Sequence, residues 1–270
     1  MVGQDYLKKV IQQYVDKKLF PRFVIITGQK GSGKKTLAKY IAKRLSAYEV
    51  YPGNSVEDVR QAIENAYHCT FPAIYIFPDS DKMSAQAKNA LLKVTEEPPR
   101  NAYFIITVED IGNTLSTLKS RGTELKMEAY SEKELSQFTL DETVLKIATN
   151  PGQVEQLLSM NAPEFYKFCI KVIDNIGEVT GVNALKIGQS FSFKEDQEGY
   201  DPVLFLDCVS RICFARCVEE YEQLSTDDLR YYNKMVMLCG RYKNELNLTG
   251  VKKDATFDAW LLECWKLGRE

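Results

Sequence analysis

The sequence lacks several features that would assign it to a function class at once. No apolar run approaches the ~18 residues of a membrane span, and the N-terminal stretch MVGQDYLKKV has no apolar core typical of a signal peptide. The net charge of −2 and the pI near 5.8 give no overall cationic field with which the chain alone would bind nucleic acid. We therefore expect a soluble, cytoplasmic protein without a membrane partner.

Residues that bind metals are also scarce. The seven cysteines form no C-x-x-C pair, and the only histidine, His68, has no evident acidic or cysteine partner. Cys208, Cys213 and Cys217 lie on the apolar stretch LFLDCVSRICFARCV and raise the alternative of a zinc site. Zinc ligands usually come in closely spaced pairs that include histidine, so we favour reduced cysteines packed as small apolar side chains and predict no metal site.

The 270 residues, 44% of them hydrophobic, suffice for more than one domain. The first half alternates apolar strand patterns with helical periodicity. Strands are predicted at 23–27, 47–52, 73–77 and 102–107, and helices at 35–46, 55–67 and 84–97. This alternation favours an α/β domain with a parallel sheet covered by helices on both faces.

After residue 129 no further strong strand pattern appears. Ser131 and Glu134 have the spacing of a capping box, and NPG at 150–152 separates short helical segments. Longer helices are predicted at 164–176, 182–191, 201–221, 227–246 and 256–267, with 192–202 as a loop. We predict three parts: a core at 1–128, a small helical lid at 129–162 and an all-α domain at 163–270.

The stretch GQKGSGKKT, which follows the apolar run FVIIT, almost fits the phosphate-loop pattern G-x-x-x-x-G-K-[ST]. Glycines in such a loop let backbone N–H groups surround phosphate oxygens at a helix N-terminus, and the lysine reaches the β- and γ-phosphates. The predicted nucleotide-binding residues are Gly28, Gly31, Ser32, Gly33, Lys34, Lys35 and Thr36.

Both positions that would bind Mg²⁺ depart from the pattern of a hydrolysing enzyme. Lys35 stands where Ser or Thr is needed, and Thr36 is one residue late, about 100° around the helix. After the strand AIYIF, Pro78 occupies the place of the metal aspartate, although Asp79 or Asp81 could shift toward it. We therefore predict a site that binds ATP or ADP without efficient hydrolysis, if it binds a nucleotide at all.

The run DSDKMSAQAKNALLKVTEEPPRNAYFIITVEDIGNTLSTLKSRG, residues 79–122, resembles the clamp-loader subunits of the AAA+ class, and most of all the delta-prime subunits of bacterial DNA polymerase III. VGQDYLKKVIQQYV and VNALKIGQSFSFK are similar to the same subunits. The resemblance implies an AAA+ phosphate-loop core, a helical lid and a C-terminal helical collar that assembles subunits into a ring. Such a ring opens a sliding clamp and places it on primer-template DNA.

The resemblance also implies roles for single residues. Ser120 and Arg121 match the family's Ser-Arg-Cys motif, whose arginine reaches the ATP of a neighbouring subunit, although Gly122 replaces the cysteine. Thr107 matches a nucleotide sensor, and Gln153 stands where the second sensor would be arginine. The family's four-cysteine zinc module is missing, since residues 46–60 contain no cysteine.

Three functions remain open from the sequence. The first is a delta-prime-like subunit with a silent site, whose Arg121 serves gamma/tau-like neighbours in a complex with a delta-like subunit. The second is a gamma/tau-like motor, or another AAA+ ATPase, that hydrolyses ATP with rearranged metal ligands. The third, a phosphate-loop kinase, has only the shared loop in its favour. Lys88 and Lys93 are candidates for DNA contact, with a solvated helix face as the alternative.

Overall fold

The computed structural model describes residues 1–193, 198–248 and 250–269. The chain divides into two compact units. The α/β unit comprises residues 1–134 and 150–152, and the helical unit comprises residues 135–149 and 153–270. The predicted division into core, lid and collar stays a prediction, and the predicted loop at 192–202 includes residues 194–197, which lie outside the described residues.

The α/β unit contains a five-stranded sheet in the order β2-β3-β4-β1-β5, and all neighbouring strands run parallel. The strands are β1 (Phe23–Thr27), β2 (Tyr48–Val50), β3 (Ala73–Phe77), β4 (Ala102–Val108) and β5 (Thr123–Lys126). Every residue of β1 and β3 is buried, as expected for central strands of a sheet covered on both faces.

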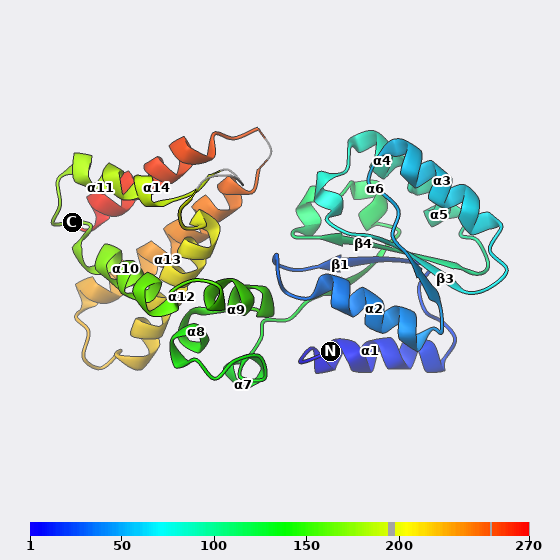
Figure 1. Cartoon of the computed structure of the whole chain (residues 1–270), viewed down its shortest axis with the longest axis horizontal. Helices are drawn as coiled ribbons and strands as arrows, with labels where there is room; N and C mark the ends of the chain where they lie inside the picture. Colours follow the sequence, from blue (N-terminus) through cyan, green and yellow to red (C-terminus); the bar gives the residue numbers. More distant parts are fainter. Residues whose placement is uncertain (194–197, 249, 270) are drawn as a thin grey trace. The chain divides into compact units, whose positions relative to one another are not determined.

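Helices cover both faces of this sheet, as the sequence predicts (Figure 1). Phe23 and Ile25 of β1 belong to the apolar cluster on the side of α3, α4 and α6, whereas Val24 and Ile26 belong to the cluster on the side of α1 and α2. This alternation follows from the two-residue repeat of a strand. The helices are α1 (Asp5–Asp16), α2 (Lys34–Arg44), α3 (Val56–Tyr67), α4 (Ala85–Ala90), α5 (Leu92–Glu96) and α6 (Ser116–Lys119).

Two local features of this unit differ from the sequence expectation. Strand β5 was not predicted, because TELK has charged residues at alternate positions and buries only Leu125. The helix predicted at 84–97 is divided at Leu91, whose φ of −67° and ψ of −19° are close to 3₁₀ geometry. The capping box of α3 is present as predicted, with Ser55 and Asp58 exchanging hydrogen bonds.

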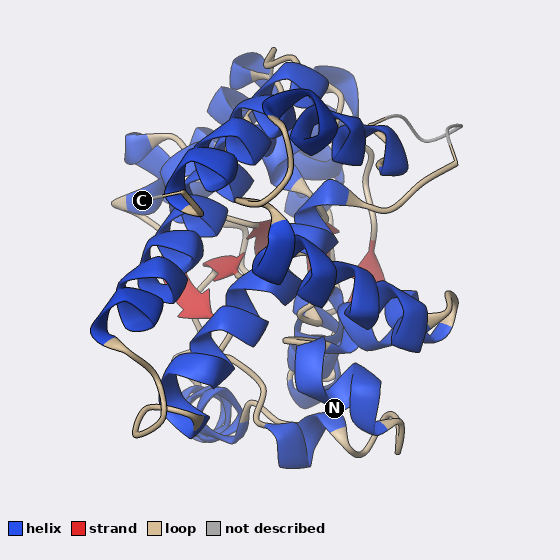
Figure 2. Ribbon diagram, turned by 90° about the vertical axis from the view of Figure 1, so that its left-hand side faces the viewer, coloured by secondary structure: helices blue, strands red, loops and turns tan. Residues whose placement is uncertain are grey.

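The regular structure of the helical unit, among the described residues, is helical apart from a bridge between Phe191 and Tyr200 (Figure 2). Its helices are α7 (Glu132–Leu135), which begins at the end of the α/β unit, α8 (Glu142–Ile147), α9 (Pro151–Leu158), α10 (Ala162–Asn175), α11 (Gly181–Ile187), α12 (Pro202–Glu219), α13 (Thr226–Leu246) and α14 (Lys253–Leu267). Short 3₁₀ segments follow β3 and β4 in the α/β unit, at Ser80–Lys82 and Ile111–Asn113, and a third follows α11 in the helical unit, at Gly188–Ser190.

Aromatic side chains form much of the core of the helical unit. Phe191, Phe205, Phe257 and Trp260 are fully buried and contact one another through their rings. The cysteines of this unit pack as small apolar residues: Cys208 and Cys213 are buried, Cys217 is half-buried, and all seven in the chain are free thiols. Burial raises the pKa of the Cys208 and Cys213 thiols, so these groups stay protonated at neutral pH.

In the part of the chain that the structure describes, no helix is both long enough and apolar enough to cross a membrane. Among the same residues, no three His, Cys, Asp or Glu side chains gather in a group that could hold a metal ion.

Candidate functional site

The phosphate loop lies between the carboxyl end of β1 and the first turn of α2. Gly31 and Gly33 have φ values of 81° and 90°, in the left-handed region that favours glycine. Gly33 is the N-cap of α2 and offers no side-chain cap. The first N–H groups of α2 therefore have no partner within the helix, which is the arrangement that binds anions at helix N-termini.

Lys34 turns back into the loop. Its side chain is buried, and its Nζ donates hydrogen bonds to the carbonyl oxygens of Gly28, at 2.6 Å, and Gln29, at 2.9 Å. Burial lowers the pKa of Lys34, and the carboxylates of Glu109, Asp79 and Asp81 partly offset this effect. To bind a phosphate, Lys34 must break its hydrogen bonds to Gly28 and Gln29 and replace them with hydrogen bonds to phosphate oxygens.

Other residues cover the loop from outside. Tyr130 is buried and its hydroxyl donates to the Ser32 carbonyl oxygen at 2.9 Å, while the Gly152 amide donates to the Gly31 carbonyl oxygen at 3.0 Å. The Ser32 hydroxyl is buried, and no described group forms a hydrogen bond with it. This orphaned hydroxyl and the free N–H groups of α2 fit a phosphate group, so the loop has kept residues that could hold ATP or ADP.

The positions expected to bind Mg²⁺ do not fit the ion. The Lys35 side chain is exposed and its Nζ lies 4.9 Å from the centre of the Tyr51 ring. Thr36 is also exposed. Pro78, at the end of β3, has no side-chain ligand, and its carbonyl oxygen accepts a hydrogen bond from Asn54 at 3.0 Å. Lys35 therefore contributes a positive charge where the ion would need an oxygen.

The neighbouring acidic residues are held by the backbone. Asp79 adopts a left-handed φ of 51°, and its amide donates to the Thr107 hydroxyl at 3.1 Å. Asp81 accepts a hydrogen bond of 2.7 Å from the Glu109 amide through one carboxylate oxygen, while the other oxygen is buried without a described partner. Thr107, the predicted sensor, thus lies at this carboxyl edge of the sheet and positions the chain that follows β3.

Arg121 lies at the amino ends of the strands, whereas the phosphate loop lies at their carboxyl ends. It follows α6 and precedes β5, and the register pairs Thr123 of β5 with Val24 near the start of β1. By this register, Arg121 lies beside residue 22, just before β1 begins. The phosphate loop begins at residue 28, after Thr27, which is six residues further along the chain. At about 3.3 Å per residue the two sites are about 20 Å apart along the strand direction, so Arg121 cannot reach a nucleotide in the chain's own loop.

Local contacts hold the Arg121 side chain. One guanidinium nitrogen lies 3.0 Å from a carboxylate oxygen of Glu96 in α5, and another donates to the Thr117 carbonyl oxygen at 3.0 Å. The Ser120 hydroxyl donates to the same carbonyl oxygen at 3.1 Å. Both side chains of the Arg121–Glu96 pair are more than a third exposed, so the pair contributes little to stability and can open.

Gly122, the third residue of this motif, stands where a larger side chain would clash with β1. A Cβ atom there would lie 2.8 Å from the Cδ1 and Cγ1 atoms of Ile25 and 2.9 Å from Phe23 Cδ1. Both of these β1 side chains are buried. A cysteine at this position has no room in this chain unless the Ile25 and Phe23 side chains shift.

Gln153, predicted at the position of the second sensor, is buried and belongs to a hydrogen-bond network of the helical unit. Its Oε1 accepts from the amide and the hydroxyl of Thr149, at 2.8 and 2.7 Å, and its Nε2 donates to Asp207 at 2.8 Å. The other Asp207 oxygen accepts from Lys243 at 2.5 Å. These bonds join α9, α12 and α13, so Gln153 has a structural role here.

The two lysines considered for DNA contact make contacts within the α/β unit. Lys88 Nζ lies 3.4 Å from the Asp81 carbonyl oxygen, and Lys93 Nζ lies 5.7 Å from the centre of the Tyr67 ring. Lys93 is exposed and Lys88 is half-buried. Sequence reasoning did not identify Tyr130, Gly152 or Glu96, because each contacts its functional partner from a distant part of the chain.

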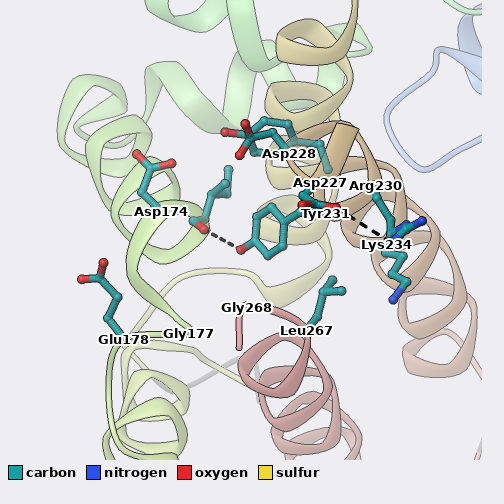
Figure 3. Close-up of a pocket in the computed structure, with 12 residues that line it drawn as sticks. Asp174, Gly177, Glu178, Asp227, Asp228, Arg230, Tyr231, Lys234, Leu267 and Gly268 are labelled. Atoms are coloured by element: carbon teal, nitrogen blue, oxygen red, sulfur yellow. Dashed lines mark hydrogen bonds and ion pairs between the residues drawn. The ribbon is translucent and has the colours of Figure 1, made fainter. Parts of the chain in front are cut away.

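The helical unit has a hollow of about 440 Å³ between α10, α13 and the end of α14 (Figure 3). Two of its polar side chains are already engaged: the Tyr231 hydroxyl donates to the Ile173 carbonyl oxygen at 2.6 Å, and Asp174 pairs with Arg216 at 2.5 Å. Burial raises the pKa of Tyr231, which keeps the donating hydroxyl protonated. The first contact ties α13 to α10 and the second ties α12 to α10, so we interpret the hollow as part of the packing of the unit.

Comparison with known proteins identifies the relatives of this chain. Residues 52–131 match the family described as DNA polymerase III, delta subunit. DNA polymerase III subunit gamma of Buchnera aphidicola subsp. Schizaphis graminum is 23% identical over 88% of this chain and 77% of its own length. Subunit gamma/tau of Mycoplasma pneumoniae is 27% identical over 44% of this chain, which spans 22% of that longer protein. Subunit delta′ of Buchnera aphidicola subsp. Acyrthosiphon pisum is 35% identical over 34% of this chain and 29% of its own length.

Among solved structures, the RuvB Holliday junction branch migration motor of Thermotoga maritima has a TM-score of 0.51 and 15% identity, covering 96% of this chain and 88% of its own. This similarity, at low identity, concerns the fold. The chain has the parallel-sheet fold of AAA+ phosphate-loop ATPases with a helical C-terminal part, and it is related to the clamp-loader subunits of DNA polymerase III.

Proposed function

We propose that this relative of the DNA polymerase III clamp-loader subunits is a delta-prime-like subunit. In this proposal the chain does not hydrolyse ATP itself but offers Arg121 to ATP bound by a neighbouring subunit. It works in the cytoplasm with gamma/tau-like and delta-like subunits, and the assembly loads a sliding clamp onto primer-template DNA during DNA replication.

The observation that carries the proposal is the state of the phosphate loop. The loop retains a phosphate cradle, but Lys35 and Pro78 replace both protein ligands of the catalytic metal. Phosphoryl transfer in this class depends on Mg²⁺ to neutralise the developing charge. A chain without these ligands can bind a nucleotide while its turnover is lost.

The placement of Arg121 supports a role toward a neighbour. Its guanidinium is exposed at the edge of the sheet opposite the chain's own phosphate loop. An arginine supplied by a neighbour stabilises the charge that spreads over the transferred phosphate, and its contribution to rate is on the order of 10³ or more. The weak pair with Glu96 holds the side chain near the surface at little energetic cost to its release.

The second candidate is a gamma/tau-like motor subunit, or another AAA+ ATPase, that hydrolyses ATP. Two observations favour it: relatives of this chain include gamma, gamma/tau and tau subunits, and Lys34 lies near the carboxylates of Asp79, Asp81 and Glu109. Steady Mg²⁺-dependent ATP hydrolysis by the purified chain would favour this candidate over the first.

The test is the ATPase rate of a complex reconstituted with the gamma/tau-like and delta-like subunits of the same organism. We expect Arg121→Ala to lower the clamp- and DNA-stimulated rate by roughly 10² to 10³, and Lys34→Ala to change it less than about twofold, because only Arg121 acts on a hydrolysed nucleotide. Arg121→Lys should restore little of the lost rate, since an ammonium group lacks the planar set of N–H donors with which a guanidinium binds a phosphate through two hydrogen bonds. Arg100→Ala, at another exposed arginine of the same unit, is the matched control.

The results separate the candidates. Equal and large losses for Lys34→Ala and Arg121→Ala would contradict the silent site and favour the motor. An ATPase rate of the complex that does not depend on Arg121 would contradict the role toward a neighbour. For DNA, neutralising Lys88 and Lys93 should reduce the salt dependence of binding by the assembly, and an unchanged slope removes them as DNA contacts.

A further inference from the structure

Positive charge is concentrated in the first fifty residues of the chain. Residues 1–50 contain eleven lysines and arginines and three aspartates and glutamates, a formal net charge of +8, whereas the whole chain has a net charge of −2. Within this segment, residues 17–48 contain nine lysines and arginines and no aspartate or glutamate. The low net charge of the whole chain therefore hides a strongly basic part, and such asymmetry is typical of chains that bind a polyanion.

The fold gathers much of this charge on one face of the α/β unit. Helices α1 and α2 cover one face of the sheet, and α3 and α4 cover the other (Figure 1). Lys35, Lys39 and Lys43 follow one another at intervals of four residues along α2, so they lie on the same side of that helix. All three are exposed, and the first and last are about 12 Å apart along the helix axis. We call Lys35, Lys39 and Lys43 the lysine stripe.

The lysine stripe is not neutralised by ion pairs or by its surroundings. Among the residues that the structure describes, no carboxylate lies within ion-pair distance of a stripe lysine. Eight lysines and arginines belong to α1, α2 and the turn after α1, against three carboxylates on α1 and the adjacent strand β2. The cations are Lys8, Lys9, Lys17, Lys18, Lys35, Lys39, Lys43 and Arg44, and the carboxylates are Asp5, which pairs with Lys8 at 2.9 Å, Asp16 and Glu49.

Further carboxylates lie near the beginning of α2, at the carboxyl edge of the sheet. Asp79, Asp81 and Glu109 lie near Lys34, whose charge opposes theirs. Glu134 accepts hydrogen bonds from the amide and the hydroxyl of Ser131. The middle and the end of α2, with Lys39 and Lys43, are therefore the most positive part of this face.

The lysine stripe is unfavourable for the helix that carries it. Lys35 lies in the first turn of α2, which contains no acidic residue, and the helix dipole disfavours a cation there. Lys43 lies in the last turn, where the dipole favours it. Like charges at intervals of four residues repel each other along a helix, so the dipole does not compensate for the stripe as a whole. A bound polyanion would replace this repulsion by attraction.

We propose that the lysine stripe binds the phosphate backbone of nucleic acid, without reading the bases. Lysine side chains are among the usual contacts of backbone phosphates, and surfaces that bind nucleic acid are more positively charged than those that bind proteins. The stripe lies on the face of the sheet opposite α4 and α5, which carry Lys88 and Lys93. It is therefore a second nucleic-acid surface, and it does not depend on the proposed function.

The composition of this face disfavours the other anionic partners. From residue 20 to residue 47, no large apolar side chain is exposed. The core of a protein interface is rich in aromatic side chains and poor in charge, and a helix that lies on a lipid surface inserts an apolar face. The exposed side of α2 offers neither, so an acidic protein and an anionic membrane fit it less well than nucleic acid does.

The test uses the purified full chain and a short DNA duplex, whose affinity is measured by fluorescence anisotropy over a range of salt concentrations. Lys39→Gln/Lys43→Gln removes two phosphate contacts, so the slope of log K against log salt should become shallower by about 1.8, and the affinity at low salt should fall roughly tenfold or more. Lys39→Arg/Lys43→Arg keeps both charges and should keep the slope. Duplexes of unrelated sequence should bind equally, because phosphates carry no sequence information.

A matched control is available on another helix. Lys167 and Lys171 are exposed and four residues apart on α10. Lys167→Gln/Lys171→Gln therefore removes the same charge with the same spacing, and it should leave the slope and the affinity unchanged. The thermal midpoint of each variant, measured without DNA, establishes that it is folded.

Each contrary result identifies a different error. An unchanged slope for Lys39→Gln/Lys43→Gln, an equal change for the α10 control, or no binding by the unaltered chain at low salt overturns the nucleic-acid site. Stripe-dependent binding to polyglutamate or to anionic vesicles that matches or exceeds binding to DNA overturns the assigned ligand in favour of an acidic protein or a membrane. None of these results affects the proposed function, which is tested by the ATPase rate of the assembly and by Arg121.

Discussion

Placing a single methyl group on Gly122 should destabilise the α/β unit. The new Cβ atom would lie 2.8 Å from two atoms of Ile25 and 2.9 Å from Phe23, well inside ordinary van der Waals separation. Both side chains are buried in β1, so they cannot swing into solvent. Overpacking of this kind costs about 1–3 kcal/mol, and the lower entropy of the unfolded Ala chain offsets about 0.4–1 kcal/mol of it. We expect Gly122→Ala to lower the free energy of unfolding by about 1–2 kcal/mol, and Gly122→Cys by more.

The assay has to report on the α/β unit alone. Both tryptophans, Trp260 and Trp265, belong to the helical unit, so tryptophan fluorescence follows the wrong part of the chain. Amide hydrogen exchange of β1 in urea measures the affected unit, and tryptophan emission serves as the internal reference. Gly240→Ala is the matched control: its Cβ would meet no atom within 4 Å, and inside α13 it should stabilise by up to about 1 kcal/mol.

A double-mutant cycle with Ile25→Ala identifies the cause. Ile25→Ala alone should cost about 2–5 kcal/mol, but it removes the nearest clashing atoms. The double variant should therefore be more stable than the sum of the two single effects by about 1 kcal/mol or more. A neutral or stabilising Gly122→Ala, or strictly additive costs in the cycle, would refute the steric explanation for the glycine beside Arg121.

Three further predictions concern the phosphate loop and the helical unit. Because burial lowers the pKa of folded Lys34 below its ordinary value of 10.5, the unfolded chain binds that proton more tightly. The stability of the unaltered chain relative to Lys34→Met should therefore rise with pH between the lowered pKa and about 10.5, and a flat difference in urea titrations contradicts this. Gln153→Ala removes the buried hydrogen bonds that Gln153 makes with the Thr149 amide and with one Asp207 oxygen, and it should cost about 1–3 kcal/mol by tryptophan-monitored urea unfolding. Lys35→Thr alone should give no Mg²⁺-dependent phosphate release, whereas Lys35→Thr with Pro78→Asp restores both ligand positions and should give measurable turnover; turnover in the single variant would show that Pro78 is no obstacle.

The sequence predicts the order of strands and helices in the α/β unit well because its signals are local. The run FVIIT, the glycines of the loop and the Ser55–Asp58 box each depend on residues within one element or turn. Strand β5 escapes such reasoning because it lies at the edge of the sheet: TELK buries one side chain, and its place is fixed by pairing with β1, about a hundred residues earlier in the chain.

The candidate site shows the same limit. Residue types at positions 34, 35, 78 and 121 can be read from spacing, but the contacts that decide their chemistry are long-range. Arg121 meets Glu96 across 25 residues, and Gln153 meets Asp207 across 54. Nothing in the local pattern around Gln153 distinguishes a lost sensor from a buried structural amide, because that difference is made by Asp207 and its partner Lys243.

The two ends of β1 explain how one function can be lost while the other is kept. The phosphate loop depends on the carboxyl end of β1, on Lys34 and on the residues after β3, whereas Arg121 depends on α5, α6 and the packing of Gly122 against the start of β1. These two sets share the strand but no side-chain hydrogen bond or ion pair among those the structure describes. Substitutions that remove metal ligands at one end therefore leave the geometry of the arginine unchanged, since effects at separated sites are nearly independent. A subunit whose arginine serves a neighbour needs only the second set intact, and the sheet then acts as a rigid support for a residue whose substrate lies in another chain.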